Sequence, residues 1–364
     1  MGPFVEREHN ITLSDMTNFL QSGALLRHRG EWHLIKGPFS PQEKPNSSEI
    51  SVYCPDFYLD AKEGLLKGSE AYRLTTSELQ SLLTSFAKDP SAKPLQKATW
   101  QEPAKSDFES ALSTIQERIF KREIQKAVPV VFARSPQKVT VEDRALMILN
   151  LTKAPDTLFV YGFWQNDEGV IGATPEVLVE FEKGLLKTMA LAGTCPKSES
   201  SERESLLQDA KEMQEHRLVL EDIVETLKPL GVVQASPTGI LELPTLYHLK
   251  TDIQVQCEKD PPLVELIKRL HPTPALGVAP RSAGYQWMST FPGQEGRARY
   301  GAPFAFFGPA GALCLVGIRN LQWNKDFAMI GSGCGVVAAS EFEREWREIY
   351  QKRLSVRKIL GLEA

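Results

Sequence analysis

The chain has 364 residues, of which 42% are hydrophobic, and it carries a net charge of −4. A chain of this length and composition can bury a large core, as one large domain or two smaller ones. The slightly acidic balance, without a basic stripe or a block of Lys and Arg residues, argues against nucleic acid as a partner.

Cysteine usage and the N-terminus favour a cytoplasmic protein. The five cysteines are scattered and have no CxxC spacing, so we expect reduced, packed thiols, not disulfides or metal ligands. They are Cys54, Cys195, Cys257, Cys314 and Cys334. The first ten residues, MGPFVEREHN, lack the apolar stretch of a secretion signal.

The first hundred residues predict short strands and one helix. Strand-like runs occur at Trp32–Ile35 and Ile50–Tyr53, and a helical pattern occurs at Thr76–Phe86. A polar, proline-bearing stretch from Lys88 to Asp107 follows. It is the predicted boundary between an N-terminal part, residues 1–105, and a second region, residues 106–364, within one compact body.

The rest of the chain alternates between helical and extended patterns. In chain order we predict a helix at Phe108–Lys126, a strand at Val128–Ala133, a helix at Val141–Asn150, strands at Leu158–Trp164, Val170–Ile171, Val177–Glu182 and Leu185–Ala192, a helix at Glu202–Leu230, a strand at Leu246–Val255, helices at Leu263–Leu270 and Arg281–Ser289, a strand at Phe327–Ile330 and a helix at Glu341–Leu360. Adjacent strands between long helices predict an α+β fold with large, mainly antiparallel β-sheets.

One uncharged segment, Tyr300 to Ile318, has 19 residues, which approaches the length of a membrane span. Four glycines and two prolines interrupt it, and Gly308-Pro309-Ala310-Gly311 is typical of a turn. We therefore predict a buried hairpin of two strands, Phe304–Phe307 and Ala312–Ile318, and no contact with a membrane.

Two acidic helices are the most informative feature. Each presents two glutamates three positions apart, which places both carboxylates on one helix face. The pairs are Glu212 with Glu215, and Glu345 with Glu348. Apolar residues continue these faces, namely Val219 and Ile223 on one helix and Val356 and Ile359 on the other. Two solvated helix surfaces are the alternative, but an inward orientation requires a cation, and hard oxygen ligands suit Mg²⁺.

Nine short blocks accompany these helices in a fixed order. They are GATPEVLVEF from Gly172, LAGT from Leu191, KEMQEH from Lys211, YHL from Tyr247, HPTPALGVAPRSAG from His271, EGRARY ending at Tyr300, IRN from Ile318, GSGCG from Gly331 and SEFEREWREIYQK from Ser340. Together they resemble the chorismate-utilising enzymes: isochorismate synthase, salicylate synthase and the large subunits of anthranilate and aminodeoxychorismate synthase. The resemblance covers roughly Phe108 to Leu360 and implies stacked, mainly antiparallel sheets flanked by helices.

The resemblance implies a Mg²⁺ site between the acidic helices. In the family, Mg²⁺ joins the ring carboxylate of chorismate to these acids. Carried over, Glu215 and Glu348 are direct ligands, and Glu212 and Glu345 act directly or through water. Without a metal these acids would repel one another and the anionic substrate.

The resemblance also implies the groups that hold the substrate. Tyr300 and Arg319 match the residues that bind its second carboxylate, and Lys352 adds a cation near the metal. The other implied contacts are Gly193 and Thr194 along the ring, and the backbone N–H groups at Gly333 and Gly335.

Two residues match catalytic positions of the family. Glu176 aligns with the general acid of isochorismate synthases, and its apolar neighbours favour the raised pKa that protonation of the departing 4-hydroxyl requires. His248 matches the histidine beside the substrate ring. Ala192 and Ala275 stand where other subfamilies have a lysine and a threonine. The resemblance is therefore greatest to isochorismate synthases, which need no glutamine amidotransferase partner.

Three positions depart from the family pattern. Isochorismate synthases have a lysine base at the head of a strand ending in Ala-Arg, and alignment of Val130–Arg134 places Pro129 there. Lys126 lies three residues earlier, an offset that points to the opposite face of a continuous strand. Ala302 and Ala305 replace family glycines and are expected to narrow the pocket.

We therefore expect a Mg²⁺-dependent isochorismate synthase that acts on chorismate in menaquinone, siderophore or salicylate biosynthesis. A monomer or weak dimer is expected. Two alternatives stay open: an ammonia-dependent enzyme that forms anthranilate or aminodeoxyisochorismate, and a protein that binds chorismate without turnover because of Pro129.

Overall fold

A computed structural model describes residues 11–45, 49–59, 64–86, 95, 98–197, 203–294 and 297–362. The N-terminal decapeptide, the predicted helix start at Glu202 and the first part of the predicted boundary stretch, residues 88–94, lie outside these ranges, as do residues 96 and 97. Residues 295 and 296 of the EGRARY block also lie outside them.

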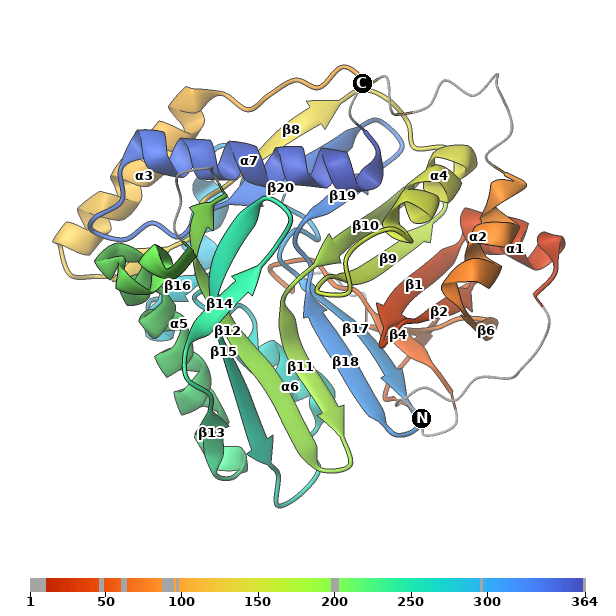
Figure 1. The fold of residues 1–364 in the computed structure, drawn as a ribbon, viewed down its shortest axis with the longest axis horizontal. Coiled ribbons are helices and arrows are strands. Elements are labelled where there is room, and N and C mark those ends of the chain that lie inside the picture. The colour runs from red at the N-terminus through yellow and green to blue at the C-terminus, as the bar shows by residue number, and fades with distance from the viewer. Residues whose placement is uncertain are drawn as a thin grey trace.

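Two antiparallel β-sheets form the centre of the molecule (Figure 1). Within the described residues the first sheet has eight strands, in the spatial order β6 (Glu70–Leu74), β2 (Glu31–Lys36), β1 (Gly23–His28), β9 (Phe159–Gln165), β10 (Glu168–Thr174), β19 (Asn320–Trp323), β20 (Ala328–Gly333) and β8 (Val130–Ser135). Because β1 pairs with β9, strands from the N-terminal part continue a sheet of the second region.

The second sheet has ten strands among the described residues. Their order is β13 (Val233–Ala235), β15 (Leu246–Gln256), β12 (Leu185–Pro196), β11 (Val177–Glu182), β18 (Gly311–Val316), β17 (Pro303–Gly308), β4 (Ser51–Tyr53), β5 (Leu65–Lys67) and β3 (Ser40–Gln42), with β14 (Gly239–Glu242) also paired to β15. A separate short pair joins β7 (Lys126–Ala127) to β16 (Val278–Ala279).

The two sheets face each other through an aromatic and aliphatic core. Tyr161 and Phe163 of the first sheet pack in one buried cluster with Phe304, Phe306 and Leu315 of the second. Such burial contributes roughly 1.5–3 kcal/mol for each large apolar side chain. The stacked arrangement confirms the predicted α+β fold with mainly antiparallel sheets.

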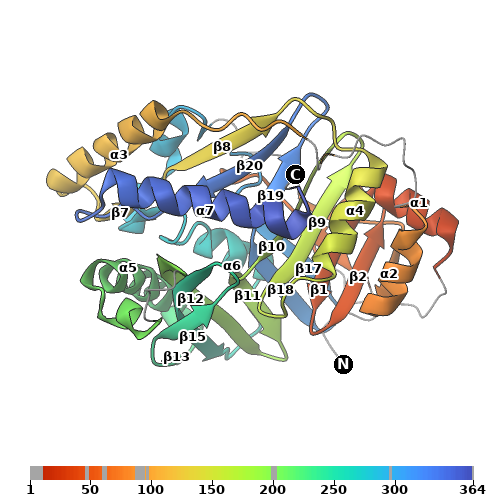
Figure 2. The same cartoon turned by 45° about the horizontal axis from the view of Figure 1, so that its top comes forward.

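Seven α-helices flank the sheets within the described residues. They are α1 (Leu13–Gln21), α2 (Thr76–Thr84), α3 (Lys105–Phe120), α4 (Val141–Leu151), α5 (Ala210–Leu227), α6 (Leu263–Leu270) and α7 (Phe342–Leu360). α7 lies along β20 of the first sheet, and α5 packs on β12 and β15 of the second (Figure 2). The site described below lies between α5 and α7.

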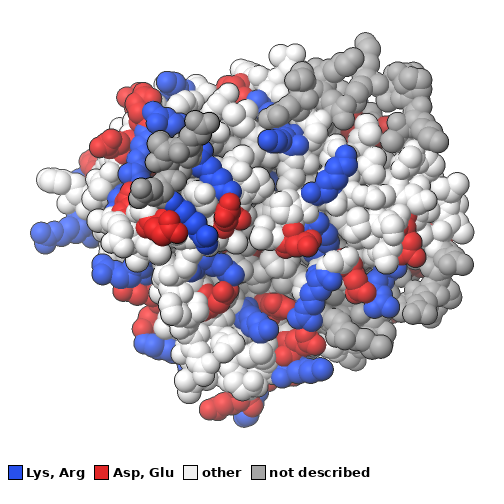
Figure 3. All heavy atoms as spheres, viewed as in Figure 1, with Lys and Arg blue, Asp and Glu red and all other residues white. Residues whose placement is uncertain are grey.

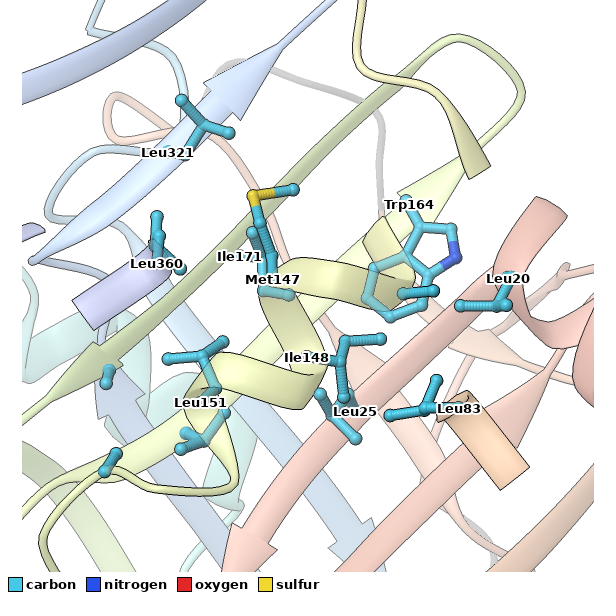
Figure 4. Packing of buried hydrophobic residues seen from close by; sticks show 14 of the residues in the cluster. Leu20, Leu25, Leu83, Met147, Ile148, Leu151, Trp164, Ile171, Leu321 and Leu360 are labelled. Carbon is cyan, nitrogen blue, oxygen red and sulfur yellow. The ribbon is translucent and has the colours of Figure 1, made fainter. Parts of the chain in front are cut away.

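A second core cluster lies between the first sheet and helices α1, α2, α4 and α7 (Figure 4). Its labelled members are Leu20, Leu25, Leu83, Met147, Ile148, Leu151, Trp164, Ile171, Leu321 and Leu360. α7 therefore takes part in the core at its C-terminal end, where Leu360 is buried, and carries its acids at its N-terminal end. This anchoring fixes the position of the acids.

Several predicted elements need correction. The helix predicted at Phe108–Lys126 ends at Phe120, and Lys126 begins β7. The helix predicted at Arg281–Ser289 is two short 3₁₀ segments, separated at Gly284, whose φ is +66°. The helix predicted from Glu202 to Leu230 is helical in α5 alone, with 3₁₀ segments before Asp209 and after Leu227. Sequence reasoning also missed α1 and β1.

The hairpin predicted between Tyr300 and Ile318 is confirmed as β17 and β18. None of the described helices is long and apolar enough to cross a membrane. Basic and acidic side chains are interspersed over the face shown in Figure 3. That face has no broad area of a single charge.

Candidate active site

The predicted substrate-binding and catalytic residues all line one buried pocket of about 50 Å³ between α5, α7 and the two sheets. They are Glu176, Gly193, Thr194, His248, Tyr300, Arg319, Gly333, Gly335 and Lys352. Glu215 lines the pocket as well, as do Ala192 and Ala275. Residues from positions 176 to 352 are therefore brought together by the pairing of distant strands.

The four glutamates of the acidic helices are all buried, as predicted. α5 begins after Asp209, whose side chain accepts a hydrogen bond from the backbone N–H of Glu212 and so fixes the first turn. Val219 and Ile223 bury the same face against the second sheet. The alternative of solvated helix faces is wrong.

Lys211 joins the two acidic helices. Its Nζ lies 2.8 Å from Glu345 Oε1 on α7, and 3.1 Å from Glu212 Oε1 and 3.8 Å from Glu215 Oε2 on α5. The lysine is itself buried. Glu212 and Glu345 therefore form an outer pair that shares one ammonium group.

Two further lysines hold the inner pair, Glu215 and Glu348. Lys126 Nζ lies 2.9 Å from Glu215 Oε1, and Lys352 Nζ lies 2.6 Å from Glu348 Oε1. Lys352 also donates a hydrogen bond of 2.8 Å to the carbonyl of Gly333. The inner acids are thus paired with cations that reach the pocket or its wall.

Glu212 has two more donors. The backbone N–H of Thr194 donates to its Oε2 at 2.8 Å, and the half-exposed Arg344 donates to its Oε1 at 2.8 Å. Within the described residues, four carboxylates therefore contact four cations: Lys126, Lys211, Arg344 and Lys352. Arg344 also contacts a fifth carboxylate, Asp209, at 3.0 Å, so these groups carry a net charge of −1 when all are ionised.

Burial and neighbouring charges act differently on the acids. Desolvation, reinforced by Glu215, raises the pKa of Glu212 to about 7, and desolvation also raises the pKa of Glu345. Desolvation also opposes ionisation of Glu215, but Lys126, Lys211 and Lys352 together outweigh it and lower its pKa. Glu215 is therefore the more firmly ionised acid.

The donor set fits Mg²⁺ in kind, because carboxylate oxygens are its usual protein ligands. Both carboxylate oxygens of the buried Glu345 lack a hydrogen-bond partner among the described residues, since the contact with Lys211 does not have hydrogen-bond geometry. In the same ranges no three acidic, histidine or cysteine side chains form a ready-made metal cage. The acids are available, but lysines now lie among them.

Gly335 permits the close approach of the chain to this cluster. A Cβ atom at this position would lie 2.1 Å from Glu215 Oε1 and 2.4 Å from the Cε of Lys126. Any side chain would therefore push these groups apart. The glycine predicted to bring backbone close to the substrate also makes room for the Lys126–Glu215 pair.

Glu176 lies at the other end of the pocket, between β10 and β11. Burial raises its pKa to about 8, although the charges of Lys126 and Lys352 act in the opposite direction. Its backbone N–H donates to Thr174 Oγ1 at 3.2 Å and its carbonyl accepts from Val316 N, so the turn that carries it is fixed. At neutral pH this carboxyl is protonated and can donate a proton.

His248 and Arg319 form a connected pair. Arg319 donates to His248 Nε2 at 3.3 Å, and His248 Nδ1 lies 3.0 Å from Thr194 Oγ1. Because an arginine only donates, Nε2 accepts and Nδ1 carries the proton. Burial, helped by Arg319 and Lys352, lowers the histidine pKa well below its usual value. The ring is therefore neutral.

Tyr300 completes the wall opposite α7. Its ring packs edge-on against Phe132, with centroids 6.0 Å apart, and burial raises its pKa. Gly331 gives it space, since a Cβ there would lie 2.6 Å from Tyr300 Cδ2. The hydroxyl thus remains a neutral hydrogen-bond donor.

The prediction that Lys126 points to the opposite face of the strand is wrong. Lys126 belongs to β7, which pairs with β16, whereas Val130 begins β8, which pairs with β20. Pro129 separates the two strands, so the alternation of faces along one strand does not apply. Lys126 is completely buried and contacts Glu215, which lines the pocket; Lys126 and Pro129 are not themselves among the lining residues.

The prediction that Ala302 and Ala305 narrow the pocket is also wrong. Both are buried in the core of the second sheet and neither lines the pocket. They do not narrow it. Lys211 was missed as a member of the site, although a lysine in the first turn of a helix is unfavourable to the helix dipole and indicates nearby acids.

Comparison with known proteins identifies the family of the chain. Residues 59–361 match the sequence model of the chorismate binding enzyme family. The salicylate biosynthesis isochorismate synthase of Pseudomonas aeruginosa is 33% identical over 199 residues, which are 52% of this chain and 42% of that protein. Isochorismate synthase MenF of Escherichia coli is 28% identical over 272 residues, 70% of this chain and 59% of that protein. The matched segment thus spans about half of these relatives' length.

Solved structures show the same fold. A structure described as a 2,3-dihydroxybenzoate-specific isochorismate synthase, DhbC from Bacillus anthracis, has a TM-score of 0.77 at 18% identity and covers 97% of this chain and 100% of that chain. MenF of Escherichia coli has a TM-score of 0.73 at 19% identity, covering 97% of this chain and 92% of that chain. With the family match over most of its length, this chain belongs to the chorismate binding enzymes.

Proposed function

We propose that the protein is an isochorismate synthase that converts chorismate to isochorismate with Mg²⁺. One observation carries the proposal: a single pocket is lined by a buried carboxyl that is protonated at neutral pH, Glu176, and by a carboxyl whose pKa is lowered, Glu215. The relatives named isochorismate synthases support it.

Substrate binding follows from charge. Chorismate is a dianion with a ring carboxylate and an enolpyruvyl carboxylate. Glu215 and Glu348 would hold Mg²⁺, with Glu212 and Glu345 directly or through water, and the ion would supply positive charge for the ring carboxylate. Arg319, which forms no ion pair with the described residues, would bind the second carboxylate.

The reaction adds one proton to the departing 4-hydroxyl and removes one proton from the attacking water. A water oxygen bonds to C2 as the ring double bond shifts and the C4–O bond breaks. The departing 4-hydroxyl takes the proton of Glu176 and leaves as water. The attacking water gives its proton to Lys126 once that lysine has left its ion pair with Glu215 as a neutral amine, its own proton passing to solvent. Exchange with solvent restores both groups. His248 and Thr194 position Arg319 and the ring.

The experiment is product analysis. Purified protein is incubated with chorismate and Mg²⁺, with chorismate and EDTA, and with chorismate, Mg²⁺ and an ammonium salt, and products are separated by HPLC. Isochorismate in the first arm and its loss in EDTA are expected. No isochorismate at any pH with Mg²⁺ would overturn the proposal.

A second candidate is an ammonia-dependent reaction. Anthranilate synthase component 1 of Pseudomonas aeruginosa is 24% identical over 315 residues, 80% of this chain and 62% of that protein. An amine-bearing product in the ammonium arm would favour this candidate. Binding without turnover, which Pro129 suggested, is less favoured because Lys126 contacts Glu215, and Glu215 lines the pocket.

The pathway, the location, the oligomeric state and the partners of the protein are also part of the proposal. Relatives are named for salicylate biosynthesis and as MenF, and the pathway of this chain stays a prediction. So do the cytoplasmic location, the monomeric or weakly dimeric state and the absence of an amidotransferase partner.

A further inference from the structure

A second cavity adjoins the active-site pocket. It has a volume of about 260 Å³ and lies where the C-terminal ends of α4 and α7 meet the turn between β14 and β15. Its walls are mainly apolar and include Leu158, Ala173, Leu243 and Ile359. The cavity is separate from the acidic cluster, which lies at the opposite ends of α5 and α7.

The polar lining of this cavity is basic. Lys153 and Lys358 lie at its exposed rim, and Arg319 lies buried at its inner end. Among the residues that the structure describes, no aspartate or glutamate lines it. In the part of the chain that the structure describes, neither rim lysine forms an ion pair. A ligand with an apolar ring and a carboxylate satisfies both the walls and these cations.

Arg319 lies between the active-site pocket and the second cavity. It lines the active-site pocket as well as the second cavity, and its two terminal nitrogens are held by different partners. One donates to Ser355 Oγ, at 2.9 Å, and Ser355 lines the second cavity. The other donates to His248, which lines the active-site pocket. A carboxylate that approaches from the second cavity therefore competes for the guanidinium that the proposed function assigns to chorismate.

We propose that this cavity is a second binding site, for a ring-bearing carboxylate, and that it is coupled to the active site through Arg319. The coupling rests on the proposed function, but the site does not. Two sources share this chemistry: the substrate on its way to the pocket, and a separate aryl carboxylate that acts as an effector.

Binding is tested first without turnover. Calorimetric titration with 2-naphthoate is performed in EDTA, on the wild type, on Lys358→Glu and on the matched control Lys325→Glu, an exposed lysine on the turn between β19 and β20. We expect one site per chain, weakened roughly three- to tenfold by Lys358→Glu and unchanged by Lys325→Glu. Ile359→Trp, which fills the cavity from α7, is expected to abolish binding. Equal binding in all variants, or none in the wild type, would overturn the proposal.

Titration with chorismate distinguishes the two possible sources of the ligand, the substrate and a separate effector. Chorismate binding in EDTA that Lys358→Glu weakens would make the substrate the natural occupant, and binding of 2-naphthoate alone would indicate an effector; both support the site. If turnover exists, 2-naphthoate is expected to raise the chorismate KM without changing kcat, and a lower kcat at constant KM would contradict competition for Arg319. Absence of turnover with intact naphthoate binding would reject the proposed function and keep the site.

Discussion

Two ends of the same pocket contain buried glutamates with opposite charge states. At the helix end, Glu215 contacts Lys126 and Lys211, and its pKa is lowered. At the sheet end, Glu176 has apolar surroundings and more distant lysines, and its pKa is raised to about 8. Burial is common to both, so the distance to a cation decides the difference. One fold thus provides an ionised and a protonated carboxyl group within one pocket.

The largest expected effect is the loss of kcat when Glu176, at the sheet end of the pocket, is substituted. Glu176→Gln keeps the shape of the side chain but removes the proton, so kcat should fall by roughly 10²–10⁴-fold. Steady-state kinetics by HPLC checks this. Calorimetry should show unchanged Mg²⁺ affinity, and a variant with near-normal kcat would contradict the role of Glu176.

Substitutions at the helix end compare the inner and outer acids. Glu345→Gln should weaken Mg²⁺ binding by ~10–100-fold, as is typical of groups that act through another ligand or water. Glu215→Gln should weaken it more, because this acid is the firmly ionised one. Calorimetric titration with Mg²⁺ measures both. The reverse order would show that the metal lies nearer the outer pair.

The pH dependence of the activity provides a further test of the raised pKa of Glu176. The protonated form of Glu176 is the donor, so activity is retained below its pKa and lost above it. Beyond pH 8, kcat/KM should fall about tenfold per pH unit. A pH–rate profile tests this limb. The residual activity of Glu176→Gln should lack the limb, and a wild-type profile that is flat to pH 10 would be inconsistent with this donor.

The smallest effect is expected at the rim of the acidic cluster. Arg344 contacts Glu212 but is half-exposed, so solvent screens the pair. Arg344→Gln should change Mg²⁺ affinity by less than about fivefold, or ~1 kcal/mol. Calorimetry and a thermal melt measure it. A change as large as that of Glu345→Gln would place Arg344 among the essential groups of the cluster.

Much of the site was predictable from the sequence, for a local reason. The spacing of Glu212 and Glu215, with Val219 one turn further on, places these residues on one helix face, which the structure buries. The motif blocks then identified the pocket residues. Helix ends and short strands were less predictable, because caps and breaks such as Asp209 and Gly284 depend on a few hydrogen bonds.

The errors came from information that is not local. Lys126 was judged by its offset from Val130 along one strand, but the chain leaves one sheet and enters another between them. The role of Lys211 depends on α7, more than a hundred residues away in sequence. The second cavity likewise brings together residues from Asn150 to Ile359. Such contacts follow only from the tertiary structure.

The most direct test of the account is a crystal structure with Mn²⁺ in place of Mg²⁺ and with chorismate bound, examined by anomalous scattering from the metal. We expect one strong anomalous peak, coordinated by Glu215 and Glu348 and by a carboxylate of the ligand. A peak elsewhere, or a bound ligand with Lys211 and Lys126 still neutralising the acids and no metal between the helices, would contradict it.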